Sequence, residues 1–295
     1  MPVPTKDIVE PLFKFAVRTP LNIAPERGKQ LEEEIFGSGK WELKPSATPA
    51  NFYAVPADKA IYLSYAGLAS LWCVAYAAFY VADAASRAQR APRAPDQTQI
   101  DIGKECADHN VVGHIAYALA LFRNDEPWPD DLAKPDPSAS LASIDGRINN
   151  LFYGALSWML LHEIAHVHHQ DIKFLPASLL VKQEYRADDF ATRWVLEDAG
   201  NGLQREFRIL VVVVALTWLF LQEIAKGKGA DHPPSILRFR EAAQIFQAGN
   251  RSVGLENAAY VLKALLDPAT AAPPFNSAKE LFEWIGLRLE ALFPP

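Results

Sequence analysis

The chain has 295 residues, of which 50% are hydrophobic and 22% charged, so it is long enough to bury one large core or two smaller ones. Its net charge of −6, with no block of Lys and Arg, argues against a nucleic-acid-binding protein. Its two cysteines are too few for a disulfide framework, and the N-terminal stretch MPVPTKDIVEPLF lacks the basic and apolar regions of a signal peptide, so we expect a cytoplasmic protein.

The first hundred residues are predicted to form an N-terminal helical region. Residues 40–56 are irregular with at most a short strand, and a long helix is expected over about 57–88. Within it, residues 61–82 contain no charged side chain and are long enough to span a bilayer, which takes about 20 residues. Their many Ala, Ser, Gly and Tyr residues favour a buried core helix, and a membrane span is the alternative. Residues 89–100 are predicted to be a linker or an exposed loop, and a second domain is predicted over residues 101–295.

The second domain is also predicted to be mainly helical. Residues 124–140, acidic and rich in proline, are typical of a mobile flap. The apolar run 209–222 reaches only about 21 Å as a helix, short of the roughly 30 Å hydrocarbon core, so it is predicted to be buried within the protein. The remaining helices are expected over residues 103–123, 145–170, 176–200, 205–226, from 233 onwards and from 277 onwards.

Four of the seven histidines lie in the stretch LHEIAHVHH, residues 161–169. His162, Glu163 and His166 form an HExxH motif. Residues four apart on a helix are offset by about 40° around its axis and about 6 Å along it, so both imidazoles point the same way and reach one ion. Glu163 then lies beside the ion, where its carboxylate can take a proton from zinc-bound water. The charge-free stretch before the motif predicts a buried helix, in which such polar side chains require partners.

Two histidines leave a third protein ligand to be found. The pattern HExxHxxGxxH is excluded, because the chain has His169 and Ile172 where that pattern requires Gly and His. Glu184, on the following predicted helix, is the candidate. Asp188 lies four residues later on the same helix face and is expected to accept a hydrogen bond from a ligand histidine.

These segments together resemble a known family. HEIAH at 162–166, EYRAD at 184–188 and HPPSILR at 232–238 are similar, in order and spacing, to the gluzincin metallopeptidases. The closest are the HtpX and CAAX-prenyl-protease-like group and its soluble relatives, and the Lit-type phage-exclusion proteases are a second similar group. The resemblance covers roughly residues 145–240. The membrane members have several spans, whereas this chain has at most one candidate, which favours the soluble relatives.

The resemblance implies a mainly α, zincin-like helical core around the HExxH helix, with at most a small β element. It implies a Zn²⁺ cofactor bound by His162, His166 and Glu184, with Glu163 as general base. It also places His232 and Arg238 at the cleft. We expect His232 to be catalytic, as a donor to the oxyanion, and Arg238 to tie its segment to an acidic neighbour.

The predicted function is a zinc-dependent endopeptidase that hydrolyses peptide bonds of a protein or peptide substrate. A host-protein target in phage defence is an expectation by analogy. Two alternatives stay open: a non-catalytic zincin-fold regulatory or binding protein, and a membrane-anchored protease that uses residues 61–82. The intact Glu163 disfavours the first, because a protein without turnover has no need of a base there. The sequence does not indicate the substrate or the oligomeric state.

Overall fold

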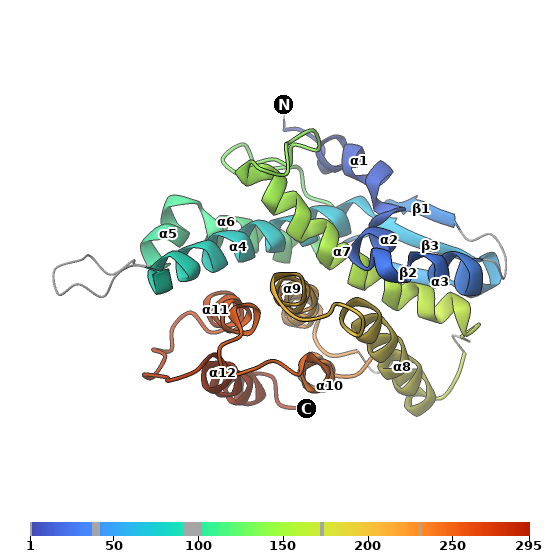
Figure 1. Ribbon diagram of the computed structural model, residues 1–295. Coiled ribbons are helices and arrows are strands. Elements are labelled where there is room, and N and C mark those ends of the chain that lie inside the picture. Colours follow the sequence, from blue (N-terminus) through green and yellow to red (C-terminus); the bar gives the residue numbers. More distant parts are fainter. Residues whose placement is uncertain (1, 37–41, 91–101, 172–173, 230–231) are drawn as a thin grey trace.

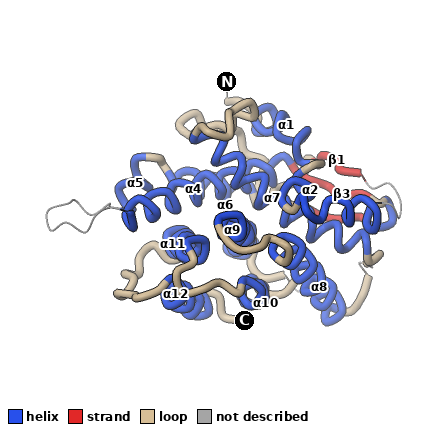
Figure 2. The backbone as a smooth tube through the Cα atoms, in the orientation of Figure 1, coloured by secondary structure: helices blue, strands red, loops and turns tan. Residues whose placement is uncertain are grey.

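The computed structural model describes residues 2–36, 42–90, 102–171, 174–229 and 232–295. The fold is mainly α, as predicted, with one small sheet at one end of the molecule (Figures 1 and 2). The helices are α1 (Thr5–Ala16), α2 (Thr19–Ile23), α3 (Gly28–Gln30), α4 (Tyr65–Arg90), α5 (Ile102–Asp108), α6 (Val111–Leu121), α7 (Ile144–His168), α8 (Ala177–Leu196), α9 (Leu203–Lys226), α10 (Ser235–Phe246), α11 (Val253–Leu266) and α12 (Ala278–Leu292).

The sheet has three strands, β1 (Glu42–Ser46), β2 (Phe52–Val55) and β3 (Ala60–Ser64), in the order β1-β3-β2. The central strand β3 pairs in parallel with β1 and antiparallel with β2. The helix predicted from residue 57 is wrong at its start, because residues 60–64 form β3 and α4 begins only at Tyr65. Pairing with a neighbour on each side satisfies the backbone of β3, and its residues Ile61 and Leu63 are fully buried.

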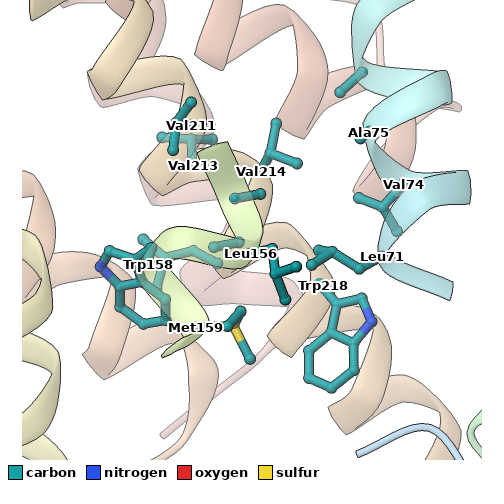
Figure 3. Packing of buried hydrophobic residues seen from close by; sticks show 14 of the residues in the cluster. Leu71, Val74, Ala75, Leu156, Trp158, Met159, Val211, Val213, Val214 and Trp218 are labelled. Carbon is teal, nitrogen blue, oxygen red and sulfur yellow. The ribbon is translucent and has the colours of Figure 1, made fainter. Parts of the chain in front are cut away.

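Helix α7 runs through the middle of the molecule and packs against α2, α4, α8, α9 and β2. It begins at Ser143, whose side chain accepts a hydrogen bond from the Gly146 N–H. Its apolar middle is buried on every side, where Leu156, Trp158 and Met159 lie among residues of α4 and α9 (Figure 3). At Gly154 a Cβ atom would lie 2.5 Å from Val211, so a glycine is required for the close approach of α7 and α9.

Two helices among the described residues are long and apolar enough to cross a membrane by length and composition, Tyr65–Ala88 and Leu203–Lys226. The sequence analysis expected one, and the second arises because α9 extends beyond the apolar run 209–222 to 24 residues. The rest of the protein buries 83% and 72% of their most apolar windows. The core of a soluble protein gives the same result, so length and composition alone do not argue for a span. Both segments lie in one hydrophobic core, in agreement with the buried alternative for residues 61–82.

The predicted boundary near residue 100 lies within residues 91–101, outside the described part of the chain, so the two-domain division stays a prediction. Helix α4, from the first region, packs against α6, α7, α9 and α11 of the second. The loop at 124–140 differs from the predicted flap. Its Trp128 is buried and bridges to Val3, and no residue of this loop lines the cleft described below.

Candidate active site

The HExxH motif occupies the last turns of α7, at the point where the helix leaves the core. His162 and Glu163 are buried, at 5% and 7% exposure, and His166 is partly buried. The helical spacing brings the Nε2 atoms of His162 and His166 within 3.1 Å of each other. Their rings stand nearly perpendicular, at 81°, so both nitrogens face one point.

Glu184, on α8, completes this arrangement. Its Oε1 lies 3.3 Å from Nε2 of His166, and its Oε2 lies 3.4 Å from Nε2 of His162. The small, buried Ala187 and Ala191 of α8 allow this helix to lie close to α7. The structure therefore brings together the three side chains predicted as metal ligands, with one ligand atom of each within 4.8 Å of the others.

The ring nitrogen Nδ1 of each histidine, which faces away from the centre, contacts a carboxylate. Nδ1 of His162 lies 2.9 Å from Oδ1 of Asp188. Arg238, on α10, donates to both oxygens of Asp188, at 2.6 and 2.7 Å. Arg238 thus lies where the sequence placed it, beside an acidic neighbour. Burial would raise the pKa of Asp188, but the charges of Arg238 and His162 hold it below its usual value.

Nδ1 of His166 has a similar partner that the sequence analysis missed, namely Oδ2 of Asp171 at 2.8 Å. Asp171 is also paired with Arg186 of α8. It follows the helix, where Gln170 adopts a left-handed conformation (φ 53°) and the Asp171 N–H donates to the carbonyl of His166. This turn folds Asp171 back onto the motif. An acid five residues after the second histidine was the available signal, but helical periodicity did not reveal it.

The donor atoms fit a tetrahedral cation. Because each Nδ1 faces a carboxylate and is best assigned as the N–H donor, each Nε2 presents a lone pair to the other and to Glu184. Atoms about 2.0–2.1 Å from a tetrahedral zinc ion are about 3.3–3.4 Å apart, close to the separations of 3.1, 3.3 and 3.4 Å here. Among the described residues, the buried Oε2 of Glu184 has no hydrogen-bond partner of good geometry.

The electrostatics of this group also favour positive charge at its centre. Burial would raise the pKa of Glu184, but the imidazoles of His162, His166 and His232 hold it well below its usual value. Burial would lower the pKa of His162, but Asp188 and Glu184 outweigh burial and raise it to about 10. A cation bound between these ligands would supply the positive charge that a protonated imidazole supplies in its absence.

Glu163 and His232 border the same centre. Burial raises the pKa of Glu163, whereas the charges of His162 and His166 and, to a smaller extent, the Ala54 N–H of β2 oppose that shift. His232, with a side chain 55% exposed, lies at the rim with Nδ1 3.0 Å from Oε2 of Glu184. His232 therefore contacts the proposed metal ligand Glu184, and its role as a donor to the substrate stays a prediction.

These residues line a cleft of about 500 Å³. One wall is the edge strand β2, and the other walls come from α7, α8, the end of α9 and residues 232–235. The carbonyl of Asn51 accepts from the Ser64 N–H, so Asn51 faces β3. Because successive strand residues alternate, the backbone groups of Phe52 and Ala54 face away from β3, along the cleft.

Comparisons with known proteins identify relatives of this chain. The chain is 25% identical over 132 residues to the cell death peptidase of Escherichia coli (strain K12), which is 43% of this chain and 44% of that protein. The chain thus spans less than half the length of this relative. No solved structure gives a significant match. The sequence model of the family described as peptidase U49 matches residues 61–258, which include every predicted site residue. The chain belongs to the peptidase U49 family.

Proposed function

We propose that this peptidase is a zinc-dependent endopeptidase, with zinc bound by His162, His166 and Glu184 and with Glu163 as general base. Membership of a peptidase family supports proteolysis of a protein substrate. The observation that carries the metal assignment is the convergence of two Nε2 atoms and the Glu184 carboxylate at 3.1–3.4 Å. Because both Nδ1 atoms face carboxylates, the Nε2 lone pairs are left to bind a metal ion.

A bound zinc ion would polarise the scissile carbonyl and lower the pKa of a water molecule. The chain supplies the rest. Glu163 accepts the proton of the attacking water on its carboxylate and delivers it to the leaving nitrogen. Its raised pKa, caused by burial, brings it nearer to the pH at which it must both accept and release that proton. Asp188 and Asp171 hold the two imidazoles with Nδ1 protonated.

The edge strand β2 suggests how a substrate lies in the cleft. The outward backbone groups of Phe52 and the Ala54 carbonyl are available to an extended peptide, which would add a strand to the sheet. The Ala54 N–H beside Glu163 then aligns a peptide bond with the base. His232 also lines the cleft, and in this proposal its imidazole donates to the negative charge that develops on the substrate carbonyl oxygen.

Metal analysis combined with cleavage mapping tests this proposal. Wild type, Glu163→Gln and the matched control Glu197→Gln, an exposed residue outside the cleft, would be purified, assayed for zinc and incubated with a complex protein mixture. We expect about one zinc per chain in all three, with proteolysis lost only in Glu163→Gln, by at least about 100-fold. Wild-type cleavage by that variant contradicts the general-base role. Active protein without zinc contradicts the metal assignment.

We also propose a role in cell death or phage defence, supported by the name of the E. coli relative and by the resemblance to phage-exclusion proteases. Induced expression in a bacterial host should be toxic for wild type and harmless for Glu163→Gln. Equal growth of both strains would contradict the proposed role in cell death or phage defence. The expected cytoplasmic location is likewise a proposal.

A further inference from the structure

Three cations gather where α9 ends at the cleft. Arg123 donates to the carbonyl of Ala225 (3.2 Å), Lys226 donates to that of Ala50 (3.2 Å), and Lys228 donates to that of Pro294. Within the described part of the chain, none of the three pairs with a carboxylate. Lys226 and Lys228 line the cleft itself. We call these three side chains the basic rim.

Among the described residues, no acidic group of the cleft forms an ion pair with the basic rim, and each of them has another hydrogen-bonding partner. Glu223 accepts from the Ser235 N–H at 2.7 Å, and Asp171 is paired with Arg186. Glu184 is engaged by the histidines, and Glu163 faces the Ala54 N–H. The basic rim therefore has no ion-pair partner within the described residues, although the net charge of the protein is −6.

Cations near the last turn of a helix are common, because they interact favourably with its negative end. Lys226 goes beyond this. Its ammonium reaches a different element, Ala50 ahead of β2, and lies 5.7 Å from the centre of the Phe122 ring. Although the residue as a whole is exposed, desolvation around the ammonium lowers the pKa of Lys226. A partly dehydrated ammonium without a counter-ion favours the approach of a carboxylate.

The position of Lys226 along the edge strand defines which part of a substrate it would meet. The backbone groups of Phe52 and Ala54 face away from β3, and the Ala50 carbonyl just ahead of the strand accepts from Lys226. Ala50 precedes Ala54 by four residues, so the two lie at most about 13 Å apart along the chain. The free edge ends there, because the Ala50 N–H is already bonded to the carbonyl of Leu121.

We propose that the basic rim is a specificity site for an acidic side chain of the substrate, three to five residues from the scissile bond on one side. This inference rests on the proposed function, because it assumes a peptide paired with β2 and cut beside Glu163. Lys226 provides the main contact, and Lys228 and Arg123 extend the positive field along the departing chain.

Cleavage preferences test the proposal. A proteome-derived peptide library would be digested with wild type, Lys226→Met and the control Lys263→Met, and the new termini would be sequenced. Lys263 is matched because it lies in the last turn of α11 and donates to the Pro268 carbonyl at 2.8 Å, outside the cleft. We expect Asp and Glu to be enriched at one position three to five residues from the cut for wild type and Lys263→Met, but not for Lys226→Met.

A pair of synthetic peptides with Glu or Gln at that position gives the magnitude. Wild type should prefer Glu by about fivefold in kcat/KM, the upper range for one partly exposed ion pair. This preference should approach one in Lys226→Met, and also in wild type at 1 M salt, where the screening length is about 3 Å. Because the salt series uses only the wild-type protein, it tests whether the preference for Glu is electrostatic even if Lys226→Met folds poorly.

Two results would overturn the inference while proteolysis persists: no acidic preference in wild type, or an unchanged preference in folded Lys226→Met. A wild-type protein that cuts no peptide contradicts the proposed function instead, so the two failures are distinguishable.

Discussion

The link from His162 through Asp188 to Arg238 allows one perturbation to be worked out in detail. Asp188 receives two hydrogen bonds from Arg238 at 2.6 and 2.7 Å and lies 2.9 Å from Nδ1 of His162. The side chains of Asp188 and Arg238 are only 4% and 7% exposed. Asp188→Asn keeps the shape of the side chain but removes its charge, and its amide nitrogen must face either the imidazole or the guanidinium.

Two separable effects follow. Arg238 keeps a buried charge that no longer faces a carboxylate on Asp188, and breaking such a pair costs about 3–5 kcal/mol of folding free energy. His162 loses the acceptor that sets its tautomer, so zinc affinity should fall by roughly 10–100-fold. Urea unfolding of chelator-treated protein measures the first effect, and competition with a chromophoric zinc chelator measures the second.

The double variant Asp188→Asn with Arg238→Met separates the two causes. Because it removes both charges, it should recover much of the lost stability, whereas zinc affinity should stay low. An unchanged zinc dissociation constant in Asp188→Asn would refute the orienting role of Asp188. Stability losses that simply add in the double variant would refute the buried ion pair.

Three further predictions concern other contacts. His232→Ala should retain zinc while kcat falls at least about tenfold, because a lost donor to the oxyanion costs up to about 3–4 kcal/mol; wild-type kcat with zinc bound would leave His232 as a rim residue only. Asp171→Asn should weaken zinc binding by about tenfold or more, whereas the exposed Asp189→Asn should leave it unchanged, and equal affinities in a chelator titration would count against Asp171. The pair with Arg208 lowers the pKa of Glu26 below its ordinary 4.5, so Glu26 contributes stability that is present above pH 4.5 and is lost as pH falls through the lowered pKa. Denaturant unfolding of Glu26→Gln should therefore show lower stability at neutral pH and a weaker decline in acid than wild type, and parallel curves would contradict this.

The sequence alone indicated the features that depend on neighbours along one helix. The spacing of His162 and His166 determines that their rings share a face, whatever the rest of the chain does. Helix ends were predictable for the same reason, because turn chemistry is local. Pro176 directly precedes α8, Gly200 after that helix has a positive φ of 61°, and Ser277 accepts a hydrogen bond from the Glu280 N–H at the start of α12.

Glu184 and Asp188 were predictable for a related reason. Because they lie four residues apart on one helix, their carboxylates share a face, and packing of α8 against α7 brings both carboxylates to the histidines. The sequence did not show that α8 would make that approach. Its packing against α7 depends on the small Ala187 and Ala191, but it also depends on contacts with α9 and α10.

Only the tertiary structure decided the contacts between segments far apart in the chain. Strand β3 was predicted as helix because a short apolar run is compatible with both helical and strand periodicity. Residues 60–64 form a strand because they pair with β1 and β2. Asp171 reaches His166 through a left-handed turn at Gln170 that no periodicity reveals. Arg238 meets Asp188 across fifty residues, and Ala54 meets Glu163 across more than a hundred. The physical reason is that helical geometry acts through hydrogen bonds between neighbours, whereas the cleft exists only where burial of α4, α7 and α9 in one core brings separate elements together.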